Sequence, residues 1–392
     1  MPGTGSPATL MTDRLLFITQ YFAPAWGYGG PPIVLYRLTR ELVNLGFSIT
    51  VITTDSLDGR RQKSGKEIID GVKVFRFPTV SNCLAYKFKL FYVPFIRRKI
   101  KNMLAGSKFV FFSDLRAVLN WQVYPLVKSM GIPYGIFTFG QIPYDSGMKG
   151  QIKKVFDKLW VSDFVTSAKF RFCQTEHERE MYRQFSIAKE NTQLLLLPVD
   201  SHSGKKTGNK KNFRKRFGIS ETDFLLLYVG RLNKLKGIDS IIRSVRGLRN
   251  KHNITLLIVG RDDGCEGQLR QEAGIEAGKC IIFAGPLYED AVYEAYRNAD
   301  CFIVTPRFFE ETSTAALEAL SCGIPVITSE QSEIPYLEEY KAGIIVKDIS
   351  RLDTAILTMM LQRDKYKKGT INLIRNKYDS SKIAKRFVSF LT

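Results

Sequence analysis

The sequence contains no apolar run that approaches the roughly 18 residues a membrane-spanning helix needs. It also lacks a D-x-D motif, a common clamp between a metal ion and a diphosphate, and it has no histidine and cysteine cluster at zinc spacing. The three histidines, His177, His202 and His252, are far apart, and we expect them at the surface. The adjacent Asp262 and Asp263 are typical of a turn. These absences predict a chain without a membrane span and without a bound metal.

Cysteine is too sparse and too scattered for a disulfide scaffold. No C-x-x-C spacing occurs, and several of the six cysteines fall in apolar strand or helix patterns: Cys83, Cys173, Cys265, Cys280, Cys301 and Cys322. The amino terminus, MPGTGSPATL, also lacks the charged and apolar regions of a signal peptide. We therefore expect reduced thiols inside a core and a cytoplasmic location.

Acidic side chains are outnumbered, with 58 Lys and Arg against 38 Asp and Glu, which gives a formal net charge of +20. Residues 1–198 hold 27 basic and 14 acidic side chains, an excess of 13, and the remainder holds 31 against 24, an excess of 7. Such an excess favours anionic partners: phosphorylated substrates, an acidic membrane face or nucleic acid. No nucleic-acid-binding motif accompanies the charge, so nucleic acid is the least favoured partner.

The first half of the 392-residue chain alternates strand and helix patterns. Residues 15–19 read as a buried strand, which feeds a loop rich in Gly and Pro that contains Gly29 and Gly30. A helix from Pro31 and the strand SITVITT complete a βαβ unit, without the G-x-G-x-x-G dinucleotide fingerprint. Strands VKVFRF, KFVFF and PYGIFTF follow, with helices between the later ones. This alternation predicts a parallel, doubly wound sheet.

A polar, basic segment over residues 201–218 is predicted to join two halves. Beyond it, strands and helices alternate again, from FLLLYVG to CFIVT. We therefore predict an α/β chain of two Rossmann-like domains, residues 1–200 and 201–375, each with its own core. Residues 376–392 have the pattern of an amphipathic helix.

The stretch richest in chemistry runs from Pro306 to Ile327, PRFFEETSTAALEALSCGIPVI. Glu310 and Glu318 stand on either side of a run of small residues, with seven residues between them. A buried strand precedes the stretch, and residues 312–314 can cap a helix that continues through LEAL. Glu310 is then expected on the loop at the strand's carboxyl end and Glu318 about one turn into the helix, where open α/β sheets bind ligands. An ordinary strand–helix joint with solvated glutamates is the alternative.

The whole pattern, with SCGIPVI after LEAL, closely resembles the E-x7-E signature of retaining GT-B glycosyltransferases of family 4. The resemblance implies two Rossmann-like domains facing a cleft, and it implies transfer of a hexosyl unit from a nucleotide diphosphate sugar. It also implies that residues 1–200 bind the acceptor, that residues 201–375 bind the nucleotide sugar, and that the helix over residues 376–392 crosses back onto the first domain. It further implies that Glu310 lies against the donor sugar and that Glu318 accepts hydrogen bonds from the ribose hydroxyls. Backbone amides would hold the sugar hydroxyls and the β-phosphate: those of Glu311, Thr312, Ser313, Thr314 and Ala315.

A second motif, G-R-L followed by K-G, begins at Gly230. Arg231 follows a strand and Lys236 precedes a helix, so both cations can stabilise the charge on a departing diphosphate without a metal. Solvated surface charges are the alternative, and the match to the family's pattern favours diphosphate binding. The absence of a D-x-D motif agrees with a metal-independent enzyme.

Three other positions carry weaker signals. Gly29 and Gly30 resemble the family's glycine loop beside the donor diphosphate and the acceptor, and Leu287 ends the segment FAGPL, where the family stacks its nucleobase. Phe139 departs from the family, which often has His or Arg before this glycine. Phe139 then packs against an unusual sugar, Gln141 takes part of the role, or activity is lost.

Residues 86–108 hold seven basic residues and no acidic one. After Pro94 the pattern predicts a helix with Ile96, Ile100, Met103 and Leu104 on one face, and its opposite face is basic: Arg97, Arg98 and Lys101. Such a helix can lie in an anionic membrane interface, where each basic residue contributes about 1 kcal/mol. A core helix with a solvated basic face is the alternative.

We therefore predict a retaining, metal-independent hexosyltransferase without a cofactor, peripheral on the inner face of the cell membrane. Its partners would be a nucleotide sugar and a sugar or lipid-linked sugar acceptor, in the assembly of surface glycans or lipid-linked oligosaccharides. Two alternatives stay open. A catalytically silent binding module is prompted by Phe139, and a nucleic-acid-binding protein is prompted by the net charge of +20.

Overall fold

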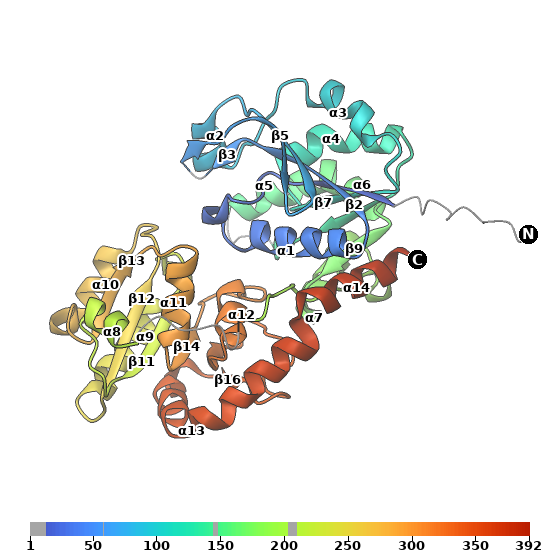
Figure 1. The fold of residues 1–392 in the computed structure, drawn as a ribbon. Helices are drawn as coiled ribbons and strands as arrows, with labels where there is room; N and C mark the ends of the chain where they lie inside the picture. The colour runs from blue at the N-terminus through green and yellow to red at the C-terminus, as the bar shows by residue number, and fades with distance from the viewer. Residues whose placement is uncertain (1–12, 58, 144–147, 203–209) are drawn as a thin grey trace, which may run out of the picture. The chain divides into compact units, whose positions relative to one another are not determined.

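The computed structural model describes residues 13–57, 59–143, 148–202 and 210–392, without the side chains of Lys149, Ile152 and Lys210. It divides the chain into two compact units (Figure 1). The first unit extends to Leu195 and takes in Ala384–Thr392, and the second runs from Leu196 to Ile383. Each unit is a doubly wound α/β body, as the sequence predicts for a GT-B chain.

The first unit is built on an eight-stranded sheet in the order β10-β9-β8-β7-β1-β2-β6-β5. All neighbours are parallel except β5, which is antiparallel to β6. Its strands are β1 Arg14–Ile18, β2 Ser48–Thr54, β5 Gly65–Ile69, β6 Val72–Phe77, β7 Phe109–Ser113, β8 Tyr134–Phe137, β9 Phe170–Cys173 and β10 Gln193–Leu194. The small hairpin of β3 Ser56–Leu57 and β4 Arg60–Arg61 stands apart. The strand order reverses between β1 and β7, which marks this unit's topological switch point.

The helices of the first unit connect these strands. They are α1 Gly30–Asn44, α2 Asn82–Phe88, α3 Ile96–Leu104, α4 Val118–Ser129, α5 Met148–Phe156, α6 Ser162–Thr166 and α7 Glu176–Met181, with a π-helical turn at Asp157–Val161 between α5 and α6. Because crossover connections are right-handed, α1 and α4, which leave the switch point in opposite directions, cover opposite faces of the sheet (Figure 1).

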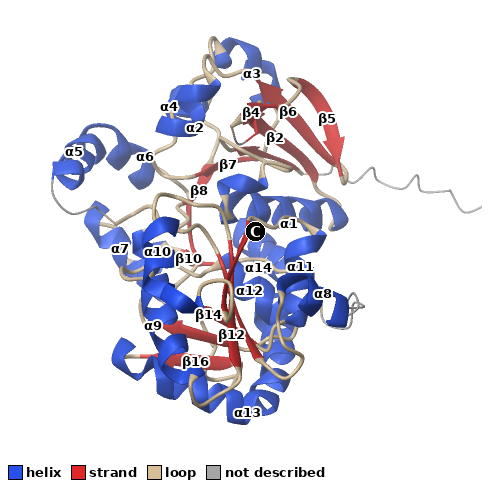
Figure 2. Ribbon diagram, turned by 90° about the vertical axis from the view of Figure 1, so that its left-hand side faces the viewer, coloured by secondary structure: helices blue, strands red, loops and turns tan. Residues whose placement is uncertain are grey.

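The second unit is built on a six-stranded parallel sheet in the order β13-β12-β11-β14-β15-β16. Its strands are β11 Phe224–Val229, β12 Ile254–Val259, β13 Ile281–Gly285, β14 Cys301–Val304, β15 Val326–Ser329 and β16 Gly343–Val346. Its helices are α8 Lys210–Phe217, α9 Ile238–Arg249, α10 Glu266–Ala273, α11 Asp290–Asn298, α12 Thr314–Ser321 and α13 Leu352–Leu373, and they surround the sheet (Figure 2). The order reverses between β11 and β14, so the segments after these two strands meet at the switch point.

The prediction of a polar joint over residues 201–218 is wrong for the second part of that segment. Residues 210–217 form α8, in which Phe213 is buried and Arg214 forms a buried ion pair with Asp300 at 3.2 Å. Residues 203–209 lie outside the described part of the chain. The composition of α8 is basic, so a composition shift alone could not separate a surface helix with one buried side from a linker.

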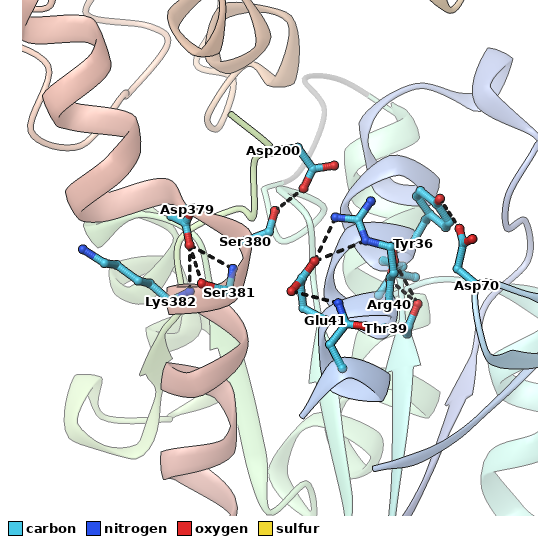
Figure 3. A network of polar contacts seen from close by, with 12 residues as sticks. Tyr36, Thr39, Arg40, Glu41, Asp70, Asp200, Asp379, Ser380, Ser381 and Lys382 are labelled. Atoms are coloured by element: carbon cyan, nitrogen blue, oxygen red, sulfur yellow. Dashed lines mark hydrogen bonds and ion pairs between the residues drawn. The ribbon is translucent and has the colours of Figure 1, made fainter. Parts of the chain in front are cut away.

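The C-terminal helix α14, Ser380–Leu391, begins in the second unit and ends in the first. Asp379 caps it by accepting hydrogen bonds from the backbone of Ser381 and Lys382 at 3.1 and 3.2 Å (Figure 3). Phe387, which is fully buried, then packs 4.9 Å from the ring of Phe111 in the core of the first unit. Among the described residues, no helix is long and apolar enough to cross a membrane.

Candidate active site

The loop after β14 and the start of α12 have the geometry that the sequence predicts. Ser313 is the N-cap, and its hydroxyl accepts a hydrogen bond from the Ala316 amide at 3.3 Å. Thr312 instead donates its hydroxyl hydrogen to the carbonyl of Glu333 at 2.9 Å. The amides of Thr314 and Ala315 belong to the first helical turn, where N–H groups have no acceptor within the helix and favour an anion.

Glu310 and Lys236 meet at the switch point of the second unit. The Lys236 ammonium lies 2.7 Å from Glu310 Oε2, and both side chains are half-buried. The Glu310 amide also donates to the Gln331 carbonyl at 2.6 Å, which fixes the loop against the segment after β15. The predicted sugar-side glutamate and one of the predicted diphosphate cations are therefore direct partners.

Gly237 explains why this approach is possible. Its φ of +65° is in the left-handed region, and a Cβ built on it would lie 2.0 Å from the Thr305 carbonyl oxygen. No side chain fits such a gap, so glycine lets the turn after β11 contact the end of β14. The glycine of the K-G pair thus sets the distance between Lys236 and the loop that carries Glu310.

Arg231 lies on the same turn but has a different partner. Its guanidinium lies 3.1 Å from Asp263, which also accepts a hydrogen bond from Asn233 at 3.2 Å. The neighbouring Asp262 accepts the amides of Gly264 and two further residues at 2.9–3.0 Å, and these hydrogen bonds hold its pKa below the usual range. Asp262 is the predicted turn residue, whereas Asp263 also orients Arg231, which the sequence did not indicate.

Gly230 lies at the end of β11, where there is no room for a side chain. A Cβ on it would come within 2.8 Å of the Tyr228 hydroxyl, and a Cβ on Gly260 would lie 1.8 Å from the Gly230 carbonyl oxygen. The two glycines therefore let adjacent strand ends pack closely behind Arg231.

Glu318 lies in the second turn of α12 and is buried, with 9% of its surface exposed. Its Oε2 accepts a hydrogen bond from the Tyr296 hydroxyl at 3.3 Å. Burial raises the pKa of Tyr296 well above its usual value, and the charge of Glu318 adds to the effect, so the phenol remains a donor. Sequence reasoning missed Tyr296 because an aromatic residue in an amphipathic helix has the same pattern as an ordinary core residue.

The other predicted donor positions are Leu287, Gly29, Gly30 and Glu311. Leu287 follows β13 at the same carboxyl edge of the sheet, but β12 separates β13 from β11. Gly29 and Gly30 belong to the first unit, where Gly29, with a φ of +97°, precedes the first residue of α1. Glu311 lies between Glu310 and the N-cap, so its amide is part of the predicted loop.

The segment after β8 shows what occupies the position of the family's histidine. Phe139 has a φ of +46°, and its ring stacks on Phe137 at 5.8 Å. The Gln141 amide nitrogen donates to Asp114 at 2.6 Å, and its oxygen accepts the Leu115 amide at 2.9 Å. Gln141 is therefore engaged in joining the loops after β7 and β8.

Asp114 is a second residue that sequence reasoning missed. It directly follows β7 beside the switch point of the first unit, is fully buried and has a φ of +70°. Burial raises its pKa to about 6, against hydrogen bonds from Tyr21, Gln20, Ser113 and Gln141 that lower it. A single aspartate after a buried strand carries no motif, so only the fold reveals this environment.

The helix predicted to enter a membrane is present as α3, but its apolar face is not available. Ile96, Ile100 and Leu104 have at most 2% of their surface exposed and belong to the core of the first unit, and Met103 packs against them. The interpretation of these residues as an interfacial face is therefore wrong. The predicted basic face is exposed: Arg97, Arg98 and Lys101.

No group of three or more His, Cys, Asp or Glu side chains in the described part of the chain could hold a metal ion. The cations at the switch point of the second unit are instead side chains. Glutamate, lysine and helix amides come together there, an arrangement suited to a polyhydroxylated ligand that carries phosphate.

Residues 209–375 match the family described as glycosyl transferases group 1. The second unit carries a glycosyltransferase group 1 domain. This domain contains Lys236, Glu310 and Glu318, the residues on which the resemblance to the family rests.

Curated relatives are similar over part of the chain. An uncharacterised glycosyltransferase of Methanocaldococcus jannaschii is 33% identical over 122 residues, 31% of this chain and 30% of that protein. The D-inositol 3-phosphate glycosyltransferase of Corynebacterium jeikeium is 30% identical over 144 residues, 34% of each chain. The lipopolysaccharide 1,2-N-acetylglucosaminetransferase of Salmonella typhimurium is 27% identical over 201 residues, 46% of this chain and 51% of that protein. The similarity thus spans about a third of the first two relatives and half of the third.

Solved structures match the whole fold. Sucrose-phosphate synthase from Thermosynechococcus elongatus has a TM-score of 0.71 at 15% identity and covers 96% of this chain and 98% of its own. The Anabaena protein HepE, solved with UDP and glucose, has a TM-score of 0.71 at 14% identity and covers 97% and 99%. At these identities the likeness concerns the fold, and it confirms the GT-B class predicted from the sequence.

Proposed function

We propose that the chain is a retaining, metal-independent glycosyltransferase that moves a hexosyl unit from a nucleotide diphosphate sugar to an acceptor hydroxyl. The bond between the anomeric carbon and the diphosphate oxygen breaks, and the acceptor oxygen bonds to the same face of the sugar. The acceptor proton passes to the departing diphosphate, so charge and atoms balance. The observation that carries the proposal is the ion pair of Lys236 with Glu310 at the switch point of a group 1 domain.

Each cation has a role in the departure of the diphosphate. Lys236 lies against the loop where the donor sugar would bind. When the donor binds, the Lys236 ammonium would leave Glu310 and pair with the diphosphate, where it would stabilise the negative charge that develops as the bond breaks. Arg231, oriented by Asp263, would supply a second positive charge and further N–H groups to the diphosphate from the same turn. The amides of Thr314 and Ala315 would hold the β-phosphate at the start of α12.

The two glutamates would bind different parts of the donor. Glu310 would accept hydrogen bonds from sugar hydroxyls and face the positive charge that develops at the anomeric carbon. Glu318, held by Tyr296, would accept both ribose hydroxyls through its two oxygens. Glu311, Thr312 and Ser313 would line the sugar from the loop.

Three further features belong to the same proposal. Gly29 and Gly30 would border the donor diphosphate and the acceptor, and Leu287 would lie near the nucleobase. The acceptor would be a sugar or lipid-linked sugar in glycan assembly at the cytoplasmic face of the membrane, supported by the Salmonella relative's name as a lipopolysaccharide glycosyltransferase. No bound cofactor is required, since the diphosphate sugar carries the activated bond.

A donor screen tests the proposal. Thermal unfolding with UDP-, GDP- and ADP-sugars should give a higher Tm with one nucleotide class, because a ligand that binds only the native state stabilises it. The shift should be lost in Glu318→Ala. No stabilisation by any donor, or an undiminished shift in Glu318→Ala, would contradict the proposed donor site.

A catalytically silent binding module is the second candidate, and Phe139 favours it. Its ring stacks on Phe137 where relatives often carry a histidine near the donor sugar. A protein that is stabilised by a donor but releases no nucleotide diphosphate, alone or with acceptors, would be such a module.

A further inference from the structure

Large apolar side chains are exposed in two short segments of the first unit. Of the 19 such residues in the described part of the chain, nine lie within residues 84–95 and 148–160. The α2 strip consists of Leu84, Phe88, Leu90, Tyr92 and Phe95, and the α5 strip consists of Met148, Val155, Leu159 and Trp160. Single exposed hydrophobic residues are normal on a soluble protein, whereas a gathering of this kind marks an interaction site.

Helix α4 joins the two strips. Its Trp121 stacks on Phe156 at 4.0 Å and lies 6.2 Å from the ring of Trp160. The side chain of the next residue, Gln122, accepts the Val93 amide at 2.9 Å and donates to the Val93 carbonyl at 2.8 Å. In Figure 2, α4 lies between α3 and α5. The strips are therefore held in one body, on either side of one helix.

Most charged side chains around both strips are basic, and the exposed Asp163 beyond the α5 strip is paired with Lys128 at 2.7 Å. Residues 86–108 contain no acidic residue, and six exposed cations lie within or beside the α2 strip: Lys87, Lys89, Arg97, Arg98, Lys99 and Lys101. Lys154 and Lys158 are exposed beside the α5 strip, whereas Asp157 is buried and paired with Arg116. An anionic partner with an apolar interior complements this combination of charge and aromatic surface.

Helix α3 contributes positive charge to this surface, but it has no apolar face that could insert into a bilayer. Ile96, Ile100 and Leu104 are used in the core, so α3 cannot lay an apolar face into lipid. The neighbouring α2 strip supplies the apolar surface that α3 lacks, with Phe95 71% exposed immediately before the helix. Trp160, with 54% of its surface exposed, is of the residue type that prefers the level of lipid headgroups.

We propose that the α2 strip and the α5 strip together form the docking face for an anionic lipid bilayer. The apolar side chains of both strips enter the interface, and the exposed basic side chains of α3, which directly follows the α2 strip, face the headgroups. The inference rests on the proposed function and deepens it, since it assigns the surface at which a lipid-linked acceptor is met.

Flotation with vesicles of phosphatidylcholine, with and without phosphatidylglycerol, tests the two strips separately. Leu159→Ser/Trp160→Ser and Phe88→Ser/Phe95→Ser should each lower partitioning onto anionic vesicles at least about tenfold, given the apolar area removed from the interface. The matched control is Ile275→Ser/Leu361→Ser, since these side chains are 78% and 86% exposed in the second unit. Wild-type protein that floats with neither vesicle, or equal losses in the control, would overturn the proposal.

The fluorescence of Trp160 provides a reading that does not depend on partitioning. The chain has three tryptophans, so Trp26→Phe/Trp121→Phe leaves Trp160 alone. Anionic vesicles should shift its emission to shorter wavelength and shield it from acrylamide, and neutral vesicles should do neither. Protein that floats with Trp160 still exposed would show that the α5 strip is not in the interface. Self-association that the strip variants abolish, without flotation of the wild type, would make a second copy the occupant.

The donor site is measured separately, so the two proposals can fail independently. Both strip variants should keep the wild-type Tm shift with the donor, because Glu310 and Glu318 belong to the second unit. Normal donor binding without flotation would refute only the docking face. Flotation without any donor binding would refute only the proposed function.

Discussion

Glu310, on the loop before α12, and Glu318, within α12, have different partners, and these partners predict different roles. Glu310 is paired with Lys236, a cation that would move to the diphosphate when a donor binds. Glu318 is buried beside Tyr296, where it can accept hydroxyls but cannot follow a moving charge. The resemblance to the family implied this split, and the contacts are consistent with it.

Replacement of each glutamate should therefore affect a different step. Glu310→Ala should abolish transfer and leave affinity for the free nucleotide diphosphate within a few-fold, because Lys236 stays available for phosphate. Glu318→Ala should weaken nucleotide binding by about 1–3 kcal/mol, the range for a lost charged hydrogen bond. Calorimetric titration of both variants with the nucleotide diphosphate checks this, and equal losses of affinity would refute the split.

Asp114 makes a prediction about stability and pH. Its pKa is about 6 in the folded chain against 3.8 ordinarily, so between these values the folded state keeps a proton that the unfolded state loses. The free energy of unfolding should therefore fall as pH rises from about 4 to about 6, by roughly 3 kcal/mol for a shift of this size. Asp114→Asn removes the titration, so this part of the pH dependence should disappear.

Tryptophan fluorescence can follow that experiment, because all three tryptophans, Trp26, Trp121 and Trp160, lie in the first unit. Urea unfolding at several pH values would be compared between the wild type and Asp114→Asn. If both lose the same stability between pH 4 and pH 6, the carboxyl group of Asp114 is not the cause.

At the scale of elements, the motif residues are positioned by two turns that follow adjacent strands, β11 and β14. Gly237 lets them approach, since any Cβ there would meet the Thr305 carbonyl. Gly264 also has a positive φ, of +93°, but nothing lies within 4 Å of its Cβ position. The two glycines thus separate the effect of backbone conformation from the effect of close packing.

Gly237→Ala should therefore destabilise the second unit by more than about 2 kcal/mol, because conformational strain and a backbone clash add. Gly264→Ala should cost about 1 kcal/mol, since only the positive φ is penalised. Urea unfolding followed by circular dichroism, with donor binding measured alongside, compares them. Similar stabilities for the two variants would contradict the close approach of the turns.

Much of this architecture could be predicted from local patterns. Buried strands such as FLLLYVG and CFIVT are continuous apolar runs, and the helix that carries Glu318 has its cap in the small polar loop. Residues whose role depends on a distant partner could not be found this way. In the sequence Asp263 resembles an ordinary turn residue, and only the fold shows that it pairs with Arg231. Tyr296 likewise resembles a core residue, and only the fold shows that its hydroxyl donates to Glu318.

The error at α3 has a similar cause. A period of 3.6 residues shows that a helix has an apolar face, but it does not show what covers that face. Ile96, Ile100 and Leu104 pack on the core, and the exposed apolar side chains lie in other segments of the first unit. Helix α8 was missed for a different reason. Only Phe213 and Arg214 of this basic segment are buried, so its composition resembles that of a linker.

At the scale of the whole molecule, each unit has its own sheet and its own switch point, and α14 links them in sequence. The first unit holds the glycine loop, Asp114 and the strips, and the second holds the cations and glutamates of the group 1 domain. The proposed chemistry depends on side chains of the second unit alone for the departure of the diphosphate.

Release of nucleotide diphosphate in the presence of EDTA tests the central claim most directly. With the donor identified by the stability screen, the wild type should release nucleotide diphosphate at an undiminished rate in EDTA. Lys236→Ala and Arg231→Ala should each reduce the rate strongly, since charge on the departing diphosphate is then less stabilised. Activity that EDTA abolishes and Mg²⁺ or Mn²⁺ restores would contradict the account.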